Sequence, residues 1–477
     1  MPVSTQKLFI LHTNDIHSHF EQMPKIASVM ETLKLKHAPH ETLTIDCGDH
    51  MDRMRIETEG SDGLANIEVM NETGYEAVVL GNNEGLTNTQ LILSEMYRNH
   101  AKFTVIGSNM FNASTGLRVD WMKPHQIVQK GDLRIGLIGV TMNYGDFYKL
   151  LDWDVQEPSA IIAGLVQKLR PEVHILVVIS HMGLSFDKRL AEEMDGIDCI
   201  LGGHTHHLLE EPLRINNTYI FATGKFGQYV GEIEIEYDFH VQDIAYVHGK
   251  CIETGTYANS PPIVRIIQEH LDKSKNKLNE CAVVLNQSLE NNWEQESPLG
   301  NLLAAGLRRW TGAEIGIVNA GVLMEGLIAG GITREILLAL CPSPINPCRM
   351  LLLGEHLKIA LEEALLAEFV MKPIKGFGFR GAVLGTLCLD GITVSYDPLG
   401  EPYQRITQVL VNGEPLDLER EYLTGTIDMF TFGIGYISLS KGTKIEYFLP
   451  EFLRDVLLHQ LQDPKAIREC TRLNWIM

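Results

Sequence analysis

Short apolar runs alternate with longer amphipathic stretches over the first half of the chain, and this alternation limits the possible folds more than any other feature. The apolar runs predict strands at 8–12, 43–46, 77–80, 103–107, 133–140, 174–180, 198–201, 219–222 and 232–237. A helical period between several of them predicts helices over 24–35, 63–73, 88–99, 157–169 and 186–194. Strands that alternate with helices in this way pack as α/β layers, with largely buried sheets.

The pattern changes after about residue 250, and the chain is too long for one hydrophobic core. Its 477 residues exceed what a single core usually organises, so two domains are expected. The amphipathic stretch 261–278 predicts a connecting helix that starts at a pair of prolines. The expected division is a first domain over 1–250, a connector over 251–280 and a second, mixed α+β domain over 281–477. In the second domain, helices are predicted near 299–311, 355–369 and 451–460, and strands near 315–318, 389–396, 405–411 and 422–426.

The net charge of the chain favours small molecules as its partners. Lys and Arg number 40 against 61 Asp and Glu, which gives a net charge of −21. A polymeric nucleic acid or an anionic membrane requires a basic surface, so neither is expected as a partner. No run of 18 apolar residues is present, the residues at the N-terminus do not predict a signal peptide, and the 8 Cys show no metal or disulfide spacing. These features predict a cytoplasmic protein.

Five short polar clusters each follow directly after a predicted strand of the first domain. They are Asn14-Asp15-Ile16-His17, Asp46-Cys47-Gly48-Asp49, Gly81-Asn82-Asn83-Glu84, Ser180-His181-Met182-Gly183 and Gly202-Gly203-His204-Thr205-His206. In α/β sheets, ligands bind at the carboxyl ends of the strands, so loops that are distant in sequence can converge there. Any one cluster alone is more often a turn or a surface loop. Together they collect Asp, Asn and His side chains, the oxygen and nitrogen ligands that divalent metals prefer.

The order and spacing of these clusters closely resemble the calcineurin-like metallophosphoesterases, in particular the two-domain bacterial 5′-nucleotidase and UDP-sugar hydrolase branch. The family pattern runs D-x-H, GD, GNHE, SHxG and GGHxH, and it matches the five clusters in order. The resemblance implies a layered α/β/β/α metallophosphoesterase domain, followed by a smaller α+β domain of the 5′-nucleotidase C-terminal type. It also implies two divalent ions, whose identity among Mn, Zn, Fe, Co and Mg stays open. One ion would be held by Asp15, His17 and His206 and the other by Asn82, His181 and His204, with Asp49 bridging both.

This ligand set has a chemical consequence. Two divalent ions bring four positive charges, and only Asp15 and Asp49 among the implied ligands are carboxylates, so the centre keeps a net positive charge of about two. That charge would attract an anionic substrate to an otherwise acidic protein. Paired metals can acidify a bridging water and stabilise both the attacking and the leaving oxygen. The resemblance therefore predicts hydrolysis of phosphate esters by in-line attack of a metal-bridging water or hydroxide. The expected substrates are nucleotides or related small phosphorylated metabolites.

The second half of the chain resembles the 5′-nucleotidase C-terminal domain, which binds the nucleoside in that family. The resemblance rests on Glu296-Ser-Pro-Leu-Gly-Asn301 and on Gly312-Ala-Glu-Ile-Gly-Ile-Val-Asn-Ala-Gly321. Candidate substrate contacts are Arg349 and Arg380 for anionic groups and Phe430 and Phe432 for stacking on a base. Solvated arginines and core aromatics are the competing interpretations of these four residues.

Three positions depart from the family pattern. Asn83 and Leu86 stand where the family has a catalytic His and the Asp that orients it, and Met324 replaces a phosphate-binding Arg. Asn83 remains the candidate catalytic residue beside Asp49, although an amide offers only a neutral hydrogen bond. Loss of a general acid typically removes about 10²–10⁴-fold of the rate, unless nearby His19, His50 or Arg53 compensates. The alternative function is therefore a metal-dependent nucleotide-binding protein with little or no turnover.

Overall fold

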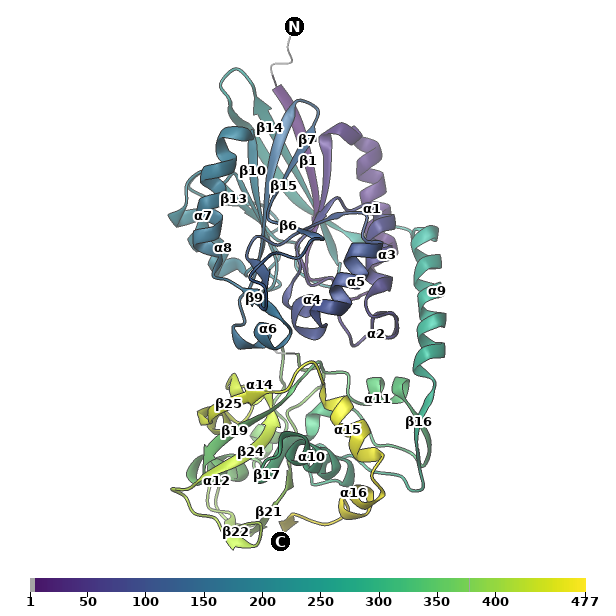
Figure 1. The fold of residues 1–477 in the computed structure, drawn as a ribbon, viewed down its shortest axis with the longest axis vertical. Helices are drawn as coiled ribbons and strands as arrows, with labels where there is room; N and C mark the ends of the chain where they lie inside the picture. The colour runs from purple at the N-terminus through teal and green to yellow at the C-terminus, as the bar shows by residue number, and fades with distance from the viewer. Residues whose placement is uncertain (1–4, 377) are drawn as a thin grey trace. The chain divides into compact units, whose positions relative to one another are not determined.

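The structure is a computed structural model that describes residues 5–376 and 378–477 (Figure 1). The chain divides into two compact units, Met1–Lys275 and Asn276–Met477. Within the described residues, no helix is both long enough and apolar enough to cross a membrane.

Two sheets form the centre of the first unit. The first sheet has the order β15-β14-β1-β2-β3-β4-β6, with parallel pairing from β1 to β6 and an antiparallel β14–β15 hairpin at one edge. Its strands are β1 (Thr5–Thr13), β2 (Thr42–Asp46), β3 (Ala77–Val78), β4 (Thr104–Ile106), β6 (Met122–Lys123), β14 (Tyr229–Asp238) and β15 (Asp243–Glu253). The second sheet has the order β12-β13-β11-β10-β8-β7, and its four central strands are parallel. Its strands are β7 (Gln126–Lys130), β8 (Leu133–Thr141), β10 (Ile175–His181), β11 (Cys199–Gly202), β12 (Leu213–Ile215) and β13 (Thr218–Phe221). A separate pair is formed by β5 (Met110–Asn112) and β9 (Trp153–Val155).

The side chains of β10 show how the two sheets pack. Its seven residues are all buried, because one face meets the other sheet and the opposite face meets helices. Val177 and Ile179 join Leu8, Ile10 and Ile45 of the first sheet in one apolar cluster. The alternate residues of β10, at 176 and 178, pack with apolar side chains of the outer helices.

Helices cover the outer faces of both sheets. Figure 1 shows α1, α3 and α5 on one side of the strands and α7 and α8 on the other. The helices of this unit are α1 (Met23–Lys36), α2 (Ile56–Ser61), α3 (Leu64–Thr73), α4 (Asn82–Thr87), α5 (Gln90–His100), α6 (Asp146–Leu150), α7 (Pro158–Leu169) and α8 (Leu184–Glu193). The predicted α/β/β/α layering is therefore confirmed.

The predicted connecting helix is α9 (Pro261–Leu278). Ile263 of this helix is buried, and two of its polar residues contact the first unit. His270 Nε2 lies 2.8 Å from the Glu68 carboxylate of α3, and the Ser274 hydroxyl donates to the carbonyl of Glu57. Gly60 of α2 allows this approach, because a Cβ there would lie 2.4 Å from the Cβ of Ser274.

The second unit is built on a five-stranded mixed sheet with the order β20-β17-β24-β19-β25. A four-stranded sheet (β23-β22-β21-β26) and the pair β16–β18 complete it. The strands are β16 (Cys281–Leu285), β17 (Ile315–Asn319), β18 (Gly330–Thr333), β19 (Pro347–Leu353), β20 (Leu387–Asp390), β21 (Ile392–Tyr396), β22 (Ile406–Val411), β23 (Glu414–Pro415), β24 (Glu421–Ile427), β25 (Thr443–Tyr447) and β26 (Trp475–Ile476). The helices are α10 (Pro298–Thr311), α11 (Arg334–Leu340), α12 (Gly354–Glu363), α13 (Ala367–Val370), α14 (Asp428–Thr431), α15 (Leu453–Leu461) and α16 (Pro464–Glu469). This mixture of helices and mostly antiparallel strands is the expected α+β domain.

Candidate metal centre

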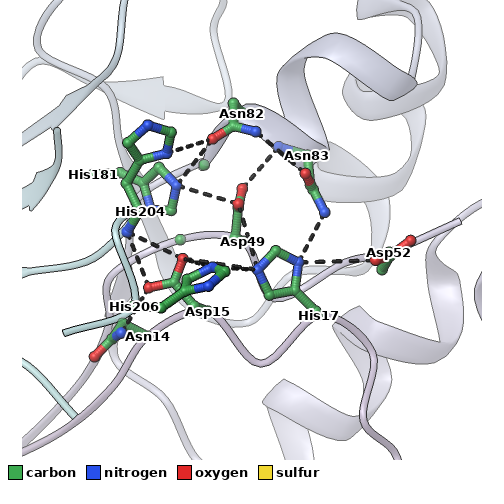
Figure 2. Close-up of polar contacts among 12 residues, drawn as sticks. Asn14, Asp15, His17, Asp49, Asp52, Asn82, Asn83, His181, His204 and His206 are labelled. Carbon is green, nitrogen blue, oxygen red and sulfur yellow. Dashed lines mark hydrogen bonds and ion pairs between the residues drawn. The ribbon is translucent and has the colours of Figure 1, made fainter. Parts of the chain in front are cut away.

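The five polar clusters meet at one edge of the two sheets. β1, β2 and β3 of the first sheet and β10 and β11 of the second sheet all end there, and each cluster lies at or just beyond the last residue of its strand. Figure 2 shows the side chains of these clusters pointing toward one another. Parallel strands end at the same edge of a sheet, and the two sheets pack face to face, so residues 15 and 206 meet although they follow strands of different sheets.

Asp15, His17 and His206 form one group of possible metal ligands. The Nε2 atoms of His17 and His206 are 3.1 Å apart, and His206 Nε2 lies 3.4 Å from Asp15 Oδ1. Asp15 is held in place by the backbone N–H of His204, at 3.0 and 2.9 Å from its two oxygens, and by the amide of Asn14 at 2.6 Å. Three ligand atoms therefore face a common point from two different sheets.

Asp49, His181 and His204 form a second group, and Asn82 lies with them. Asn82 Oδ1 is 2.8 Å from His204 Nδ1 and 3.3 Å from His181 Nε2. His181 Nδ1 donates to the carbonyl of Cys47 at 2.8 Å. In the neutral ring this hydrogen bond places the hydrogen on Nδ1, so Nε2 can offer its lone pair to a metal ion bound at the group.

The Asp49 carboxylate lies between the two groups. Its Oδ2 is 3.4 Å from His181 Nε2 and 3.8 Å from His17 Nε2, while its Oδ1 accepts the backbone N–H of Asn83 at 2.7 Å. One oxygen thus faces both groups, and the other is fixed by the start of α4.

The backbone around the centre is unusual. Asp15, His17, Asp49, His204 and His206 all have φ between 49° and 73°, a region that residues other than glycine rarely adopt. Such conformations cost about 1–3 kcal/mol each and gather at functional sites. Gly81 has an ordinary backbone conformation, but its surroundings leave no room for a side chain, because a Cβ there would lie 2.1 Å from Asp49 Oδ1. The loops after β2 and β3 are therefore packed as closely as their atoms allow.

The electrostatics of the centre favour a cation. Burial disfavours the protonated form of His181, yet the carboxylates of Asp49 and Asp15 outweigh burial and raise the pKa of His181 to about 10. Burial also opposes ionisation of Asp49, but His181 and His17 hold the pKa of its carboxyl below the ordinary value. A fully buried imidazole that keeps its proton indicates strong stabilisation of positive charge. Together with the converging oxygen and nitrogen atoms, this field fits divalent ions.

Asn83 contacts the centre through its side chain and its backbone. Its Nδ2 lies 2.9 Å from His17 Nδ1 and 3.2 Å from the carbonyl of Met51. Leu86, at the position of the family Asp, is only partly buried on α4. The amide therefore braces His17 instead of standing free, and it has no carboxylate behind it at residue 86.

The three residues considered as replacements for the family His are either paired with a carboxylate or uncharged. His19 pairs with Glu21 at 2.6 Å, and Arg53 pairs with Glu59 at 2.7 Å. His50 is buried, and burial lowers its pKa to about 3, so it carries no charge at neutral pH.

The candidate substrate residues of the second unit differ in their surroundings. Arg349 pairs with Glu446 at 2.6 Å and also donates to the carbonyl of Thr311, so its charge is already compensated. Arg380 binds Ser343 through its backbone N–H. Phe430 is fully buried and its ring packs against Tyr436, which favours the competing interpretation of a core aromatic. Phe432 is 43% exposed and is the aromatic of this pair that a ligand can reach.

The structure also adds two residues to the site. Glu84 accepts the backbone N–H groups of Asp49, Met51 and Gly81, at 3.1, 2.7 and 2.8 Å, and so ties two ligand loops together. Burial and the nearby Asp49 raise the pKa of Glu84 to about 7. Tyr144 places its hydroxyl 3.3 Å from His204 Nε2. Glu84 belongs to a motif already singled out, whereas the only signal for Tyr144 is that it follows the predicted strand 133–140.

Comparison with known proteins agrees with this geometry. Residues 9–208 match the family described as calcineurin-like phosphoesterase, and residues 273–436 match the 5′-nucleotidase C-terminal domain. An uncharacterized metallophosphoesterase of Bacillus subtilis, YunD, is 36% identical over 469 residues, which cover 96% of this chain and 99% of that protein. The chain therefore belongs to the metallophosphoesterases, a family of metal-dependent phosphoric ester hydrolases that use two divalent ions, and it carries a 5′-nucleotidase C-terminal domain.

Two solved structures share the two-domain fold. The 5′-nucleotidase precursor from Thermus thermophilus has a TM-score of 0.61 at 22% identity, with 96% of each chain covered. The NAD nucleotidase of Haemophilus influenzae has a TM-score of 0.68 at 16% identity, with 99% of this chain and 98% of that chain covered. At these identities the likeness concerns the fold alone.

Proposed function

We propose that the chain hydrolyses phosphate esters of nucleotides or related small phosphorylated metabolites at a dinuclear metal centre. The observation that carries this proposal is the position of Asp49, whose Oδ2 faces both ligand groups at 3.4 and 3.8 Å. A carboxylate that faces two separate groups of nitrogen and oxygen ligands suits a pair of cations better than a single one.

The proposed ligands divide between the two ions. Asp15, His17 and His206 hold one ion, and Asn82, His181 and His204 hold the other, with Asp49 shared. When bound, such a pair polarises a phosphoryl oxygen and lowers the pKa of a water molecule. The chain's own contribution is to fix the ligands from five strand ends and to confine the positive charge to one edge of an acidic protein.

Asn83 limits what the chain can contribute to proton transfer. Its amide donates at most a neutral hydrogen bond, and its Nδ2 already faces His17 at 2.9 Å. A poor leaving group, such as the ribose oxygen of a nucleoside monophosphate, gains little from such a residue. We therefore expect esters with good leaving groups, such as nitrophenyl esters, diphosphates and cyclic diesters, to react faster than AMP.

We further propose that the second unit selects the substrate. The proposed functional division is a metal domain over 1–250, a connector over 251–280 and a substrate-binding domain over 281–477. Support comes from the match to the 5′-nucleotidase C-terminal domain and from the exposed ring of Phe432. Arg349 is a weaker candidate for the anionic group, because Glu446 already neutralises it.

A substrate screen tests the proposed function. Metal-free protein is reconstituted with Mn²⁺ and assayed on bis-p-nitrophenyl phosphate, AMP, cyclic nucleotides, ADP and a UDP-sugar. We expect turnover of at least one nucleotide, faster reaction of activated esters than of AMP, and loss of both activities in Asp49→Asn. Absence of turnover on every ester by protein that holds two metals would contradict the proposal.

That same outcome would favour the second candidate, a metal-dependent nucleotide-binding protein. The observations behind it are Asn83, Leu86 and Met324, which remove the family's catalytic dyad and one of its phosphate-binding groups. Calorimetric titration of the metal-loaded protein with AMP and ADP separates the two functions. Tight binding without hydrolysis identifies a binder, and hydrolysis identifies an enzyme.

The proposed compartment is the cytoplasm. All eight cysteines are unpaired in the structure. Free thiols persist where the environment is reducing.

A further inference from the structure

Tyr144 lies in a short loop between β8 and α6, at the same edge of the sheets as the metal centre. The loop is tied to the centre through its backbone, because the N–H of Met142 donates to the carbonyl of His181 at 3.1 Å. A turn then reverses the chain into α6, with the Phe147 N–H donating to the Tyr144 carbonyl at 3.2 Å. The hydrogen bond from Met142 fixes the loop that carries Tyr144 relative to the end of β10, where the proposed ligand His181 lies.

A second contact fixes α6 relative to α4. Tyr148 of α6 is fully buried, and it packs against Gly85 of α4 so closely that a Cβ at residue 85 would lie 2.7 Å from the ring. Asn82, the first residue of α4, supplies an oxygen to the second ligand group. The same helix pair therefore sets the spacing between Asn82 and Tyr144.

His204 lies between these two residues and contacts each with a different nitrogen. Its Nδ1 is 2.8 Å from Asn82 Oδ1, on the side of the ligand group, and its Nε2 is 3.3 Å from the Tyr144 hydroxyl. The two rings meet edge to face, with centroids 6.1 Å apart and an interplanar angle of 70°. Each ring nitrogen of His204 therefore has a polar neighbour.

The contact with Tyr144 matters because a neutral imidazole carries only one ring hydrogen. With the hydrogen on Nε2, the Tyr144 oxygen accepts it and Nδ1 offers its lone pair to a metal. With the hydrogen on Nδ1, the same atom is a donor to Asn82 and cannot be a ligand. A tyrosine hydroxyl has an ordinary pKa of about 10, so it is a neutral phenol near pH 7 and can accept the hydrogen on Nε2.

We propose that Tyr144 is a positioning residue that holds His204 with its hydrogen on Nε2 and its Nδ1 free for the second metal ion. The inference rests on the proposed dinuclear centre. Partners that fix the other nitrogen of a histidine ligand typically change metal affinity or activity by about 10–100-fold when removed. His181 has such a partner in the carbonyl of Cys47, and Tyr144 supplies the equivalent for His204.

Mn²⁺ titration of the metal-free, full-length protein tests this role. Tyr144→Phe removes the hydroxyl and keeps the ring. We expect the affinity for one of two Mn²⁺ ions to fall about 10–100-fold, while the other ion binds as in the wild type and the melting temperature of the metal-free protein stays unchanged. The matched control is Tyr148→Phe, which makes the same change four residues later on a buried hydroxyl that does not contact His204. The control should bind both ions normally.

The possible outcomes separate this inference from the proposed function. Wild-type affinity for both ions in Tyr144→Phe would overturn the positioning role and leave the dinuclear centre intact. Equal weakening of both ions, together with a lower melting temperature, would also overturn it, because the residue would then be structural. A wild-type protein that binds fewer than two ions would overturn the proposed centre and this inference together.

Discussion

At the scale of single residues, the centre depends on where each buried charge can be compensated. Asp49 is 2% exposed and faces imidazole nitrogens from both ligand groups. Asp52, also 2% exposed, lies 3.9 Å from the outer nitrogen of His17 and is not among the proposed ligands. Asp49 is therefore proposed as a shared metal ligand and Asp52 is not, although both are buried aspartates. Substitution of each one can test this difference.

Asp49→Asn should lower metal occupancy at both sites together, because it removes the negative charge that the two ions share. The Asn side chain keeps an oxygen for the backbone N–H of Asn83, so the loop should survive. Elemental analysis after dialysis measures the occupancy. Asp52→Asn is the matched control and should retain two ions, whereas His17→Ala should lose chiefly one. Two ions retained in Asp49→Asn would exclude the shared role.

Asp428 allows a pH-dependent prediction away from the metal centre. Burial raises the pKa of Asp428 to about 7, against about 3.9 in an unfolded chain. Between these values the folded state holds a proton that the unfolded state has released, so the free energy of unfolding falls as the pH rises through 7. Asp428→Asn removes this dependence. Between pH 5.5 and 8.5, the free energy of unfolding of the variant should rise by about 2 kcal/mol relative to that of the wild type. This value follows from about 1.36 kcal/mol for each pKa unit over the part of the range below pH 7.

Scanning calorimetry of both proteins at the two pH values measures this difference, from the unfolding transition that changes when Asp428 is replaced. The control is Asp463→Asn at a helix start of the same unit, where the backbone N–H of Lys465 lowers the pKa of the carboxyl. That carboxyl stays ionised throughout, so the control should show no trend with pH. A trend of equal size in both variants would contradict the assignment to Asp428.

At the scale of elements, the centre depends on the close approach of strand-end loops. Gly81→Ala tests this packing. The backbone of Gly81, with φ −86°, suits alanine, but the new Cβ would lie 2.1 Å from Asp49 Oδ1 and 2.3 Å from its backbone nitrogen. Asp49 must then move, and overpacking of this kind costs about 1–3 kcal/mol. We expect loss of both metals with little change in the circular dichroism spectrum.

Gly164→Ala is the control for that substitution. Gly164 is exposed on α7, and apart from its chain neighbours and the backbone of its own helix no described atom lies within 4 Å of the position that its Cβ would take. Alanine should therefore stabilise the helix by about 0.5–1 kcal/mol. Metal content should stay at the wild-type level. Normal metal binding by Gly81→Ala would show that the loops tolerate more movement than their spacing indicates.

The elements themselves were predictable where local signals are strong. The prolines at 261 and 262 and the amphipathic period give α9 with its observed bounds, and all the polar clusters follow observed strands. The predicted strand 389–396 is wrong in one respect, since Gly391 at φ 78° divides it into β20 and β21 of different sheets. β15 was not predicted, because most of its residues are partly or fully exposed and it lacks a continuous apolar face.

Contacts between elements set the limit of prediction at the site. Ligand positions follow from motif spacing and strand order, so the sequence is enough to name them. The contact of Tyr144 with His204 depends on how α6 packs on α4, and the burial of Phe430 depends on the core of the second unit. Neither leaves a periodic or compositional trace in the chain.

At the scale of the whole molecule, all seven proposed ligands belong to the first unit. That unit also has its own cores, one between the two sheets and one beneath α7 and α8. The contact between His270 and Glu68 attaches α9 to the same unit. The metal centre is therefore expected to be complete without the second unit, and selectivity is expected to require it.

A fragment that ends at Leu278 tests this division of labour. It keeps β15 and the whole of α9, so no strand pair or helix of the first unit is cut. We expect two bound Mn²⁺ ions and hydrolysis of bis-p-nitrophenyl phosphate with kcat close to that of the full chain, because this ester needs little beyond the metal centre. Discrimination among AMP, ADP and a UDP-sugar, measured as kcat/KM, should largely disappear, since binding energy from the rest of the substrate would be lost. Circular dichroism and a cooperative melting transition serve as the control for folding. If the folded fragment binds no metal, a ligand must come from residues beyond 278; if it discriminates among nucleotides as the full chain does, the second unit has some other role.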